Sequence, residues 1–167
     1  MKKLIFVNGT MGVGKTATCK QLQKILPKCV FLDGDWCWDA SPFIVTSETK
    51  TMVQDNIGYL LNNFLECSEY ENIVFCWVMH EDSIINDIIS LIKGSNHRLY
   101  KFSLICSEDI LKLRISKDVE DGIRENDVLN RSLSRLKNYL SMDTQKIDTS
   151  DITPIQTAEA IYNCIYK

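Results

Sequence analysis

The sequence has no apolar run that approaches the ~20 residues of a membrane-spanning helix. It has no tract rich in lysine and arginine, and its formal net charge is −3, so we expect neither a membrane nor nucleic acid as a partner. The N-terminus runs from Met1-Lys2-Lys3 directly into an apolar stretch and lacks the pattern of a signal peptide. These absences favour a cytoplasmic location.

Histidine is scarce, and no two cysteines have the C-x-x-C spacing of a zinc site. His80 and His97 stand apart in the sequence, and the cysteines are odd in number, at positions 19, 29, 37, 67, 76, 106 and 164. Several of these positions fall within predicted strands or helices. This pattern is typical of reduced, buried thiols, and it argues against a disulfide framework or a metal centre made of histidine and cysteine.

Strand-like and helix-like segments alternate along the 167 residues. This alternation predicts one α/β domain over 1–167, with a three-layer, doubly wound arrangement around a five-stranded parallel sheet. Short apolar runs predict strands over 4–7, 29–32, 73–79, 99–105 and 146–148. Helical periodicity and capping residues predict helices that begin near 17, 47, 81, 107, 127 and 153.

The segment Gly9–Thr16 fits the phosphate-binding loop pattern G-x-x-x-x-G-K-[ST] at every position. An apolar strand precedes it and a helix follows it, so backbone N–H groups of the turn and of the helix N-terminus converge on phosphate oxygens. Lys15 supplies a charge for the outer phosphates, and the Thr16 hydroxyl is a ligand for Mg²⁺. The motif predicts a nucleoside triphosphate site made by Gly9, Thr10, Met11, Gly12, Val13, Gly14, Lys15, Thr16 and Ala17.

Two carboxylates, Asp33 and Asp35, follow the second predicted strand. Ligands collect beyond the carboxyl ends of parallel strands, where the phosphate loop also lies. One carboxylate is placed to hold Mg²⁺ through water, with Asp33 as the candidate, and Asp35 is placed to accept a proton from a hydroxyl that is being phosphorylated. The alternative is a simple turn, because Asp-Gly is also a common turn dipeptide.

Aromatic and imidazole side chains near the same edge are candidates for substrate contact. Trp36 and Trp38 either stack on a base or a sugar or close a helix against the core, and the sequence does not decide between these roles. His80 follows the third predicted strand and either contacts the substrate or is an ordinary residue at the start of a helix.

The charged segment 117–127 and the helix after it, about 117–141 in all, form a predicted lid. Arg124, Arg131 and Arg135 are placed to stabilise the negative charge that develops on the transferred phosphate when the lid closes. The alternative is a solvated helix face with local ion pairs to acidic neighbours such as Asp127. The apolar stripe of this helix is predicted at Leu129, Leu133, Leu136 and Leu140.

With these motifs in place, the chain resembles the small P-loop kinases, a superfamily that includes nucleoside monophosphate, shikimate, gluconate, adenylylsulfate and chloramphenicol kinases. The resemblance implies ATP and Mg²⁺ as cofactors, with Lys15 on the β- and γ-phosphates and Thr16 on the metal. Asp35 is implied as the base or as a ligand of the acceptor hydroxyl, with Asp33 beside it.

The same resemblance implies roles for residues further along the chain. Arg114 matches a position at which these kinases stack an arginine on adenine, and Thr149 is implied at the adenine edge. Arg124 and Arg131 are implied as lid arginines. The chain lacks the Asp-Gly-x-Pro-Arg of adenylate kinases and the Gly-Gly-Gly of shikimate kinases, and its layout is similar to tunicamycin-resistance ATP-binding proteins.

We therefore expect an ATP-dependent phosphotransferase that acts on a small molecule, as a monomer or a homodimer. The stretch 36–66 contains no arginine, and a phosphate acceptor normally requires a guanidinium, so a hydroxyl acceptor is favoured. Two alternatives stay open: a nucleoside monophosphate kinase, and an ATP-binding resistance protein that sequesters a ligand with little turnover.

Overall fold

The computed structural model describes residues 1–125 and 127–166 and contains a five-stranded, all-parallel sheet. The strands are β1 (Lys2–Asn8), β2 (Cys29–Asp33), β3 (Asn72–Trp77), β4 (His97–Ile105) and β5 (Gln145–Asp148), in the spatial order β2-β3-β1-β4-β5. The predicted α/β class and the predicted strand count are thus confirmed. Because β1 is the central strand, the loop that follows it opens at the middle of the carboxyl edge.

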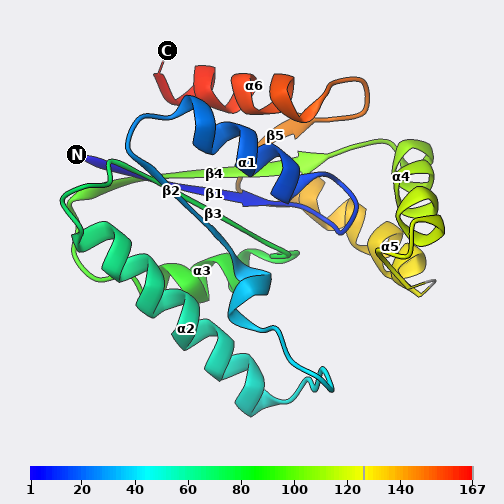
Figure 1. Cartoon of the computed structure of the whole chain (residues 1–167), viewed down its shortest axis with the longest axis horizontal. Coiled ribbons are helices and arrows are strands. Elements are labelled where there is room, and N and C mark those ends of the chain that lie inside the picture. Colours follow the sequence, from blue (N-terminus) through cyan, green and yellow to red (C-terminus); the bar gives the residue numbers. More distant parts are fainter. Residues whose placement is uncertain (126, 167) are drawn as a thin grey trace.

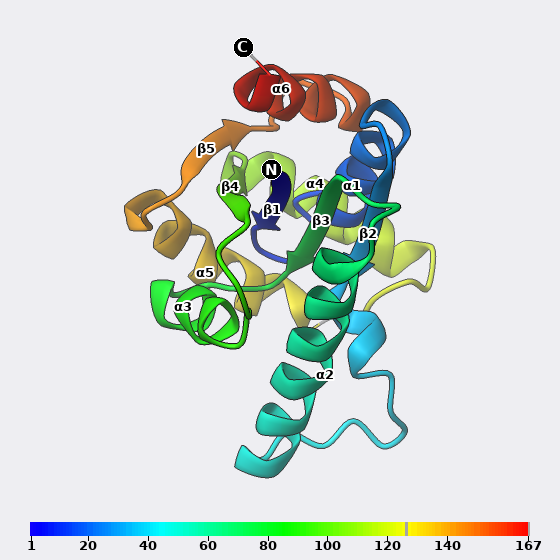
Figure 2. The same ribbon diagram turned by 90° about the vertical axis from the view of Figure 1, so that its left-hand side faces the viewer.

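Helices cover both faces of the sheet, as Figure 1 shows. On one face lie α1 (Lys15–Ile25) and α6 (Pro154–Tyr166), and on the other lie α2 (Ser47–Glu66) and α3 (Asp82–Ser90). Seen along the strands in Figure 2, the sheet separates these two pairs. No helix in the described part of the chain combines the length and apolarity needed to span a membrane.

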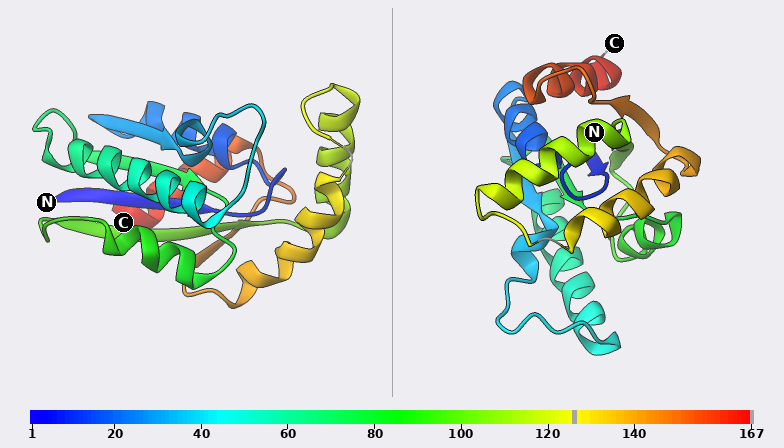
Figure 3. Two further views of the ribbon diagram at one scale, coloured as in Figure 1. Left: turned by 90° about the horizontal axis from the view of Figure 1, so that it is seen from below. Right: turned by 90° about the vertical axis from the view of Figure 1, so that its right-hand side faces the viewer.

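Two further helices, α4 (Glu108–Glu120) and α5 (Val128–Ser141), stand at the carboxyl end of the sheet. The left view of Figure 3 shows α4 standing across the strand ends, and the right view looks at this end directly. The short 3₁₀ helix η1 (Gly34–Cys37) follows β2 at the same edge. The fold therefore gathers the loops after β1, β2 and β3 under α4 and α5.

The core consists of two layers, one on each face of the sheet, and successive side chains of the central strand β1 point into them in turn. Ile5 and Val7 point into the layer shared with α1, α4 and α6, whereas Leu4 and Phe6 point into the layer shared with α2 and α3. This alternation is the period of two that a strand buried on both faces imposes. The rigid position of β1 between two packed layers fixes where its following loop begins.

Capping explains several helix boundaries. The Ser107 hydroxyl accepts a hydrogen bond from the Ile110 N–H, and Thr153 and Gln156 form the predicted reciprocal cap of α6. The helix predicted to begin near 81 is α3, which ends at Ser90, and Gly94, with a φ of 74°, lies four residues beyond that end. The seven cysteines are free thiols.

Three of the four leucines in the predicted apolar stripe of α5, Leu129, Leu133 and Leu136, pack against the core, but Leu140 does not. Leu140 is 60% exposed, whereas Ser132 and Tyr139 are fully buried. Helical spacing of leucines does not distinguish a buried stripe from a neighbouring one, because the partner surface decides which side faces inward. The buried Ser132 lies next to the phosphate loop, because its carbonyl oxygen accepts a hydrogen bond from the Thr10 hydroxyl.

Candidate functional site

The loop between β1 and α1 has the backbone conformation that the glycine pattern requires. Gly12 has a φ of 81°, and a Cβ atom there would lie 2.6 Å from Cγ1 of Ile115. Gly14 has a φ of 101° and forms the N-cap of α1. Both conformations disfavour side chains, so the loop keeps its shape only with glycine at these positions.

A pocket of about 450 Å³ opens over this loop. It is bounded by the loop and the first turn of α1, by α4 with the segment after it, and by the start of α6. Its lining consists of Met11, Gly12, Val13, Gly14, Lys15, Thr16, Ala17, Thr18, Asp35, Val78, Arg114, Asp118, Ile123, Arg124, Thr149, Ile152, Pro154 and Thr157. Most of the residues predicted to bind nucleotide therefore share one pocket; Gly9 and Thr10 are buried behind it.

Lys15 lies at the base of this pocket. Its ammonium donates to the Thr10 carbonyl oxygen at 3.1 Å, inside the loop that the lysine follows. Burial lowers the pKa of Lys15, and the carboxylates of Asp35 and Asp33 oppose that shift. The lysine is thus positioned as a point charge close to the backbone N–H groups of the loop, as phosphate binding requires.

Asp33 is 5% exposed and is bonded on both sides. Its Oδ2 accepts the Thr16 hydroxyl at 2.6 Å, and its Oδ1 accepts the Asp35 N–H at 3.1 Å, which caps η1. A hydroxyl and a carboxylate are hard oxygen ligands, so this pair fits Mg²⁺. The described residues contain no group of three or more His, Cys, Asp or Glu side chains placed to hold a metal, so a cation here would also need phosphate oxygens and water.

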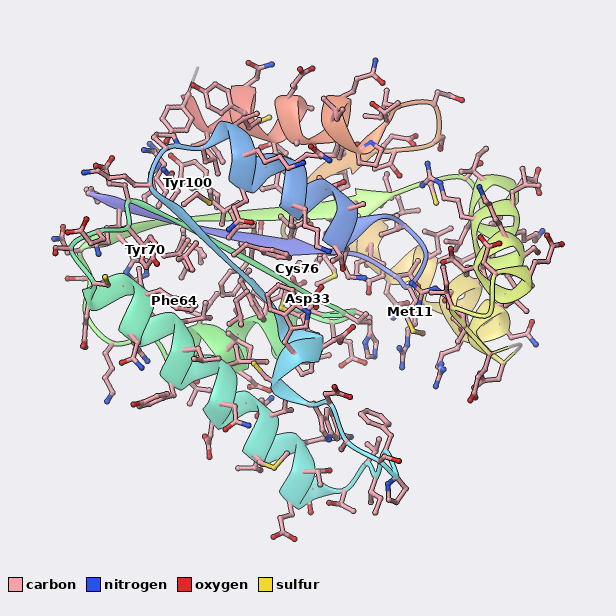
Figure 4. All side chains as sticks on the ribbon, viewed as in Figure 1. Met11, Asp33, Phe64, Tyr70, Cys76 and Tyr100 are labelled. Atoms are coloured by element: carbon pink, nitrogen blue, oxygen red, sulfur yellow. The ribbon has the colours of Figure 1, made fainter. Side chains whose placement is uncertain are left out.

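Asp35, in contrast, reaches the pocket. Burial of its carboxyl and the nearby charge of Asp33 raise the pKa of Asp35, whereas Lys15, the Trp77 indole and Arg124 oppose the rise. A raised pKa makes the carboxylate a stronger base. The two acidic residues therefore have different surroundings, since Asp33 is fixed behind the loop and Asp35 faces the ligand space. Figure 4 shows Asp33 beside Cys76, its partner in β3.

Trp77 lies at the end of β3 and was not identified from the sequence. A Cβ atom on Gly34 would lie 2.5 Å from Cγ of Trp77, so the indole packs directly against the start of η1. This contact fixes the backbone that carries Asp35. The sequence offered one signal for this contact: Gly34 directly follows one predicted strand, and Trp77 lies near the end of the next.

The two tryptophans of the following loop do not line the pocket. Trp38 packs against the core layer of α2 and lies 4.6 Å from Phe43 between ring centroids. Trp36 is 57% exposed and lies edge-on to Phe31 at 5.2 Å. It borders a separate hollow with Leu32, Cys37, Asn56, Tyr59 and Leu60.

The lid arginines have different positions. Arg124 lines the pocket, and its Nε donates to Asp118 Oδ2 at 2.8 Å. Arg131 is exposed and pairs with Asp127 at 3.3 Å, the local ion pair that the sequence offered as its alternative. Arg124 thus lies on the ligand side, whereas Arg131 is not among the residues that line the pocket.

Arg114 connects three segments around the loop. Its guanidinium donates to the Thr149 carbonyl oxygen at 2.6 Å, to the Thr149 hydroxyl at 3.0 Å and to the Val13 carbonyl oxygen at 3.3 Å. Arg114 and Thr149 also line the pocket. The hydrogen bonds hold the phosphate loop against α4 and the segment after β5.

His80 lies outside this pocket. Its Nε2 is 3.8 Å from Glu81 Oε1, and its side chain is 25% exposed. Burial lowers the pKa of His80, Arg135 lowers it further, and Glu81 raises it. A lowered pKa favours the neutral form of the imidazole.

Comparison with known proteins supports the arrangement. A family model described as an AAA domain matches residues 5–132. No curated protein sequence matches the chain. Among solved structures, the chain is similar to a sugar kinase from Janibacter sp. HTCC2649, with a TM-score of 0.72 and 15% identity over 99% of this chain and 95% of that one.

Two further solved structures have similar overlap. The tunicamycin resistance protein of Deinococcus radiodurans has a TM-score of 0.70 and 18% identity, covering 99% of this chain and 96% of that one. A gluconokinase from Sinorhizobium meliloti 1021 has a TM-score of 0.68 and 18% identity, covering 98% and 93%. At these identities the likeness establishes the fold, which is that of the small P-loop kinases.

Proposed function

This chain belongs to the AAA domain family, and we propose that it is an ATP-dependent phosphotransferase that moves the γ-phosphate of ATP to a hydroxyl group of a small molecule. The observation that carries the proposal is the position of Asp35. Its carboxylate shares one pocket with Lys15 and Arg124, and its pKa is raised. A base beside a phosphate site is what transfer to a hydroxyl requires, whereas transfer to a phosphate does not.

The residues around the pocket have separate roles in the proposed reaction. The loop and Lys15 bind the phosphates of ATP, and Thr16 with Asp33 would hold Mg²⁺, which supplies charge neutralisation on the phosphates when bound. Asp35 accepts the proton of the acceptor hydroxyl as the oxygen attacks phosphorus. Arg124 lines the same pocket, paired with Asp118, and is placed to neutralise charge on the transferred group.

The test is release of ADP from ATP over a panel of sugars, sugar acids, nucleosides and nucleoside-type antibiotics. With an active acceptor in hand, Asp35→Asn removes the base and should lower kcat by about two to four orders of magnitude. Binding of ATP should persist, because the loop and Lys15 are unchanged. Asp39→Asn is the matched control, since Asp39 is an exposed acid near the same loop and does not line the pocket.

Transfer at the original rate by the Asp35→Asn variant would overturn the assignment of the base. A nucleoside monophosphate as the sole acceptor would favour phosphate transfer instead. Tight binding of a panel compound without release of ADP, and without change in the Asp35→Asn variant, would favour a protein that sequesters its ligand.

A further inference from the structure

Trp77, the last residue of β3, lies against the residue that precedes the proposed base. Cys76 pairs with Asp33 in the parallel register, so the next residues of the two strands are Trp77 and Gly34. A Cβ atom on Gly34 would lie 2.5 Å from Cγ, 2.6 Å from Cδ1 and 3.0 Å from Cβ of Trp77. Gly34 is not among the glycines with a positive φ. The closeness of the indole, and not the backbone conformation, therefore requires glycine at this position.

The polar group of the same indole acts on Asp35. Trp77 is a hydrogen-bond donor to the Asp35 carboxylate, and this bond lowers the pKa of the carboxyl. Lys15 and Arg124 also favour the ionised carboxylate, but both are cations that line the ATP pocket. Phosphate oxygens attract such cations when a nucleotide binds. Trp77 is neutral and is not among the residues that line the pocket, so its bond to Asp35 does not compete with the nucleotide.

The element that carries Asp35 has little stability of its own. η1 is a 3₁₀ helix of four residues, and helices this short depend on tertiary contacts. Asp33 Oδ1 accepts the Asp35 N–H at 3.1 Å, which fixes the backbone of Asp35. The Trp77 indole adds a contact to the backbone of Gly34 and a bond to the Asp35 carboxylate, so it also restrains the side chain.

We propose that Trp77 is a positioning residue for Asp35. Its ring holds the start of η1, and its indole N–H holds one oxygen of the carboxylate so that the other oxygen faces the acceptor hydroxyl. The inference rests on the proposed phosphotransferase function. A general base must lie within about 2.6–3.2 Å of the oxygen whose proton it accepts, and a displacement of about 1 Å can lower the rate a hundredfold. Because Trp77 does not line the pocket, it acts through Asp35.

The first experiment detects the bond between Trp77 and Asp35 without any enzyme reaction. The chain has three tryptophans, so the indole N–H region of a ¹⁵N–¹H NMR spectrum of the full chain contains three signals. Replacing each tryptophan in turn by phenylalanine assigns these signals. In Asp35→Ala the Trp77 N–H loses its acceptor. We expect its signal to move upfield and its exchange with water to become at least about tenfold faster.

Two further variants make this result specific. Asp35→Asn keeps an oxygen acceptor without the charge, so its Trp77 signal should lie between those of the unmodified chain and Asp35→Ala. Asp39→Ala is the matched control, since Asp39 is an exposed acid near the same loop, and it should leave the Trp77 signal unchanged. An unchanged Trp77 signal in Asp35→Ala overturns the proposal.

The second experiment measures the effect on the rate, with an acceptor found through the release of ADP. Trp77→Phe keeps a ring against Gly34 and removes the donor. We expect kcat to fall by about ten- to a hundredfold and KM for ATP to stay within about twofold, because only the base is displaced. Tyr59→Phe is the matched control, since it also keeps a ring and loses a polar group, and Tyr59 is 69% exposed on α2. Thermal unfolding establishes that each variant is folded.

A double variant shows whether Trp77 acts through Asp35. In the Asp35→Asn background, Trp77→Phe should cause no further loss of kcat, because the base is already absent. An equal further loss there, or an unchanged kcat in folded Trp77→Phe, would remove the positioning role and leave the kinase intact. A Trp77 signal that depends on Asp35, in a chain that phosphorylates no acceptor, would retain the bond and remove the kinase.

Discussion

The Thr16 hydroxyl donates a 2.6 Å hydrogen bond to the buried carboxylate of Asp33. This bond joins the first turn of α1 to the end of β2. The carboxylate is also bonded to the Asp35 N–H, so one buried acid organises both the predicted metal ligand and the predicted base.

Replacing Thr16 by valine should remove the effect of Mg²⁺ on ATP affinity. The variant loses the predicted metal ligand and leaves Asp33 Oδ2 without the hydroxyl that donates to it, which should lower the free energy of unfolding by about 1–3 kcal/mol. Thr16→Ser keeps the hydroxyl and serves as the control. Calorimetric titration with and without Mg²⁺, together with thermal unfolding, measures both effects, and an unchanged Mg²⁺ effect in Thr16→Val would contradict the assignment.

Gly12→Ala should weaken ATP binding by at least about tenfold, because the positive φ disfavours a side chain and the loop must distort. The new Cβ would also meet Ile115 of α4. Gly94→Ala is a matched control, since Gly94 has a φ of 74° but no atom near the added Cβ. Equal affinities of the two variants, measured by fluorescence titration, would show that the loop tolerates the change.

Arg114→Ala should loosen the phosphate loop, because Val13 and Thr149 lose their shared donor. We expect a loss of about 1–3 kcal/mol in the free energy of unfolding, measured by urea denaturation, and a higher Kd for ATP. Lys112→Ala, on the exposed side of α4, should change neither quantity. A variant with normal stability but weak ATP binding would instead support direct contact between Arg114 and the nucleotide.

As the pH is lowered, activity should begin to fall at a higher pH than it would with an ordinary aspartate as the base. Burial and the charge of Asp33 raise the pKa of Asp35, and only the ionised carboxylate accepts a proton. The same raised pKa means that ionised Asp35 disfavours folding once the pH rises through the folded pKa. Asp35→Asn should therefore lose the acid limb of the kcat/KM profile and also raise Tm at neutral pH. A profile that keeps its limb in Asp35→Asn would assign the titration to another group.

Much of the fold and of the ATP side of the site could be predicted from local sequence. The glycine pattern of Gly9–Thr16 and the caps at Ser107 and Thr153 act through neighbouring backbone groups, so their geometry follows from residues close in the chain. The roles of Trp36 and Trp38 could not be predicted from the sequence. Trp36 packs on Phe31 and Trp38 packs on Phe43, and these contacts depend on the path of the chain after β2.

The α5 face shows most clearly where local patterns fail. Three of the four leucines predicted as a buried stripe pack against the core, but the fourth, Leu140, is exposed and Tyr139 is buried instead. The contact between Thr10 and Ser132 joins residues 122 positions apart, and no local pattern encodes it. A helix with two comparable faces is oriented by the surface that it meets.

The sequence alone determined the phosphate loop, the alternation of strands and helices and the placement of Asp33 and Asp35 after a strand. These features depend on backbone conformation and periodicity within a few residues. Only the tertiary structure decided which carboxylate is buried, that Trp77 packs against Gly34, and that Asn8 and Thr10 contact the segment after β3 and α5. Such features arise where distant segments meet, because burial and charge are set by neighbours in space.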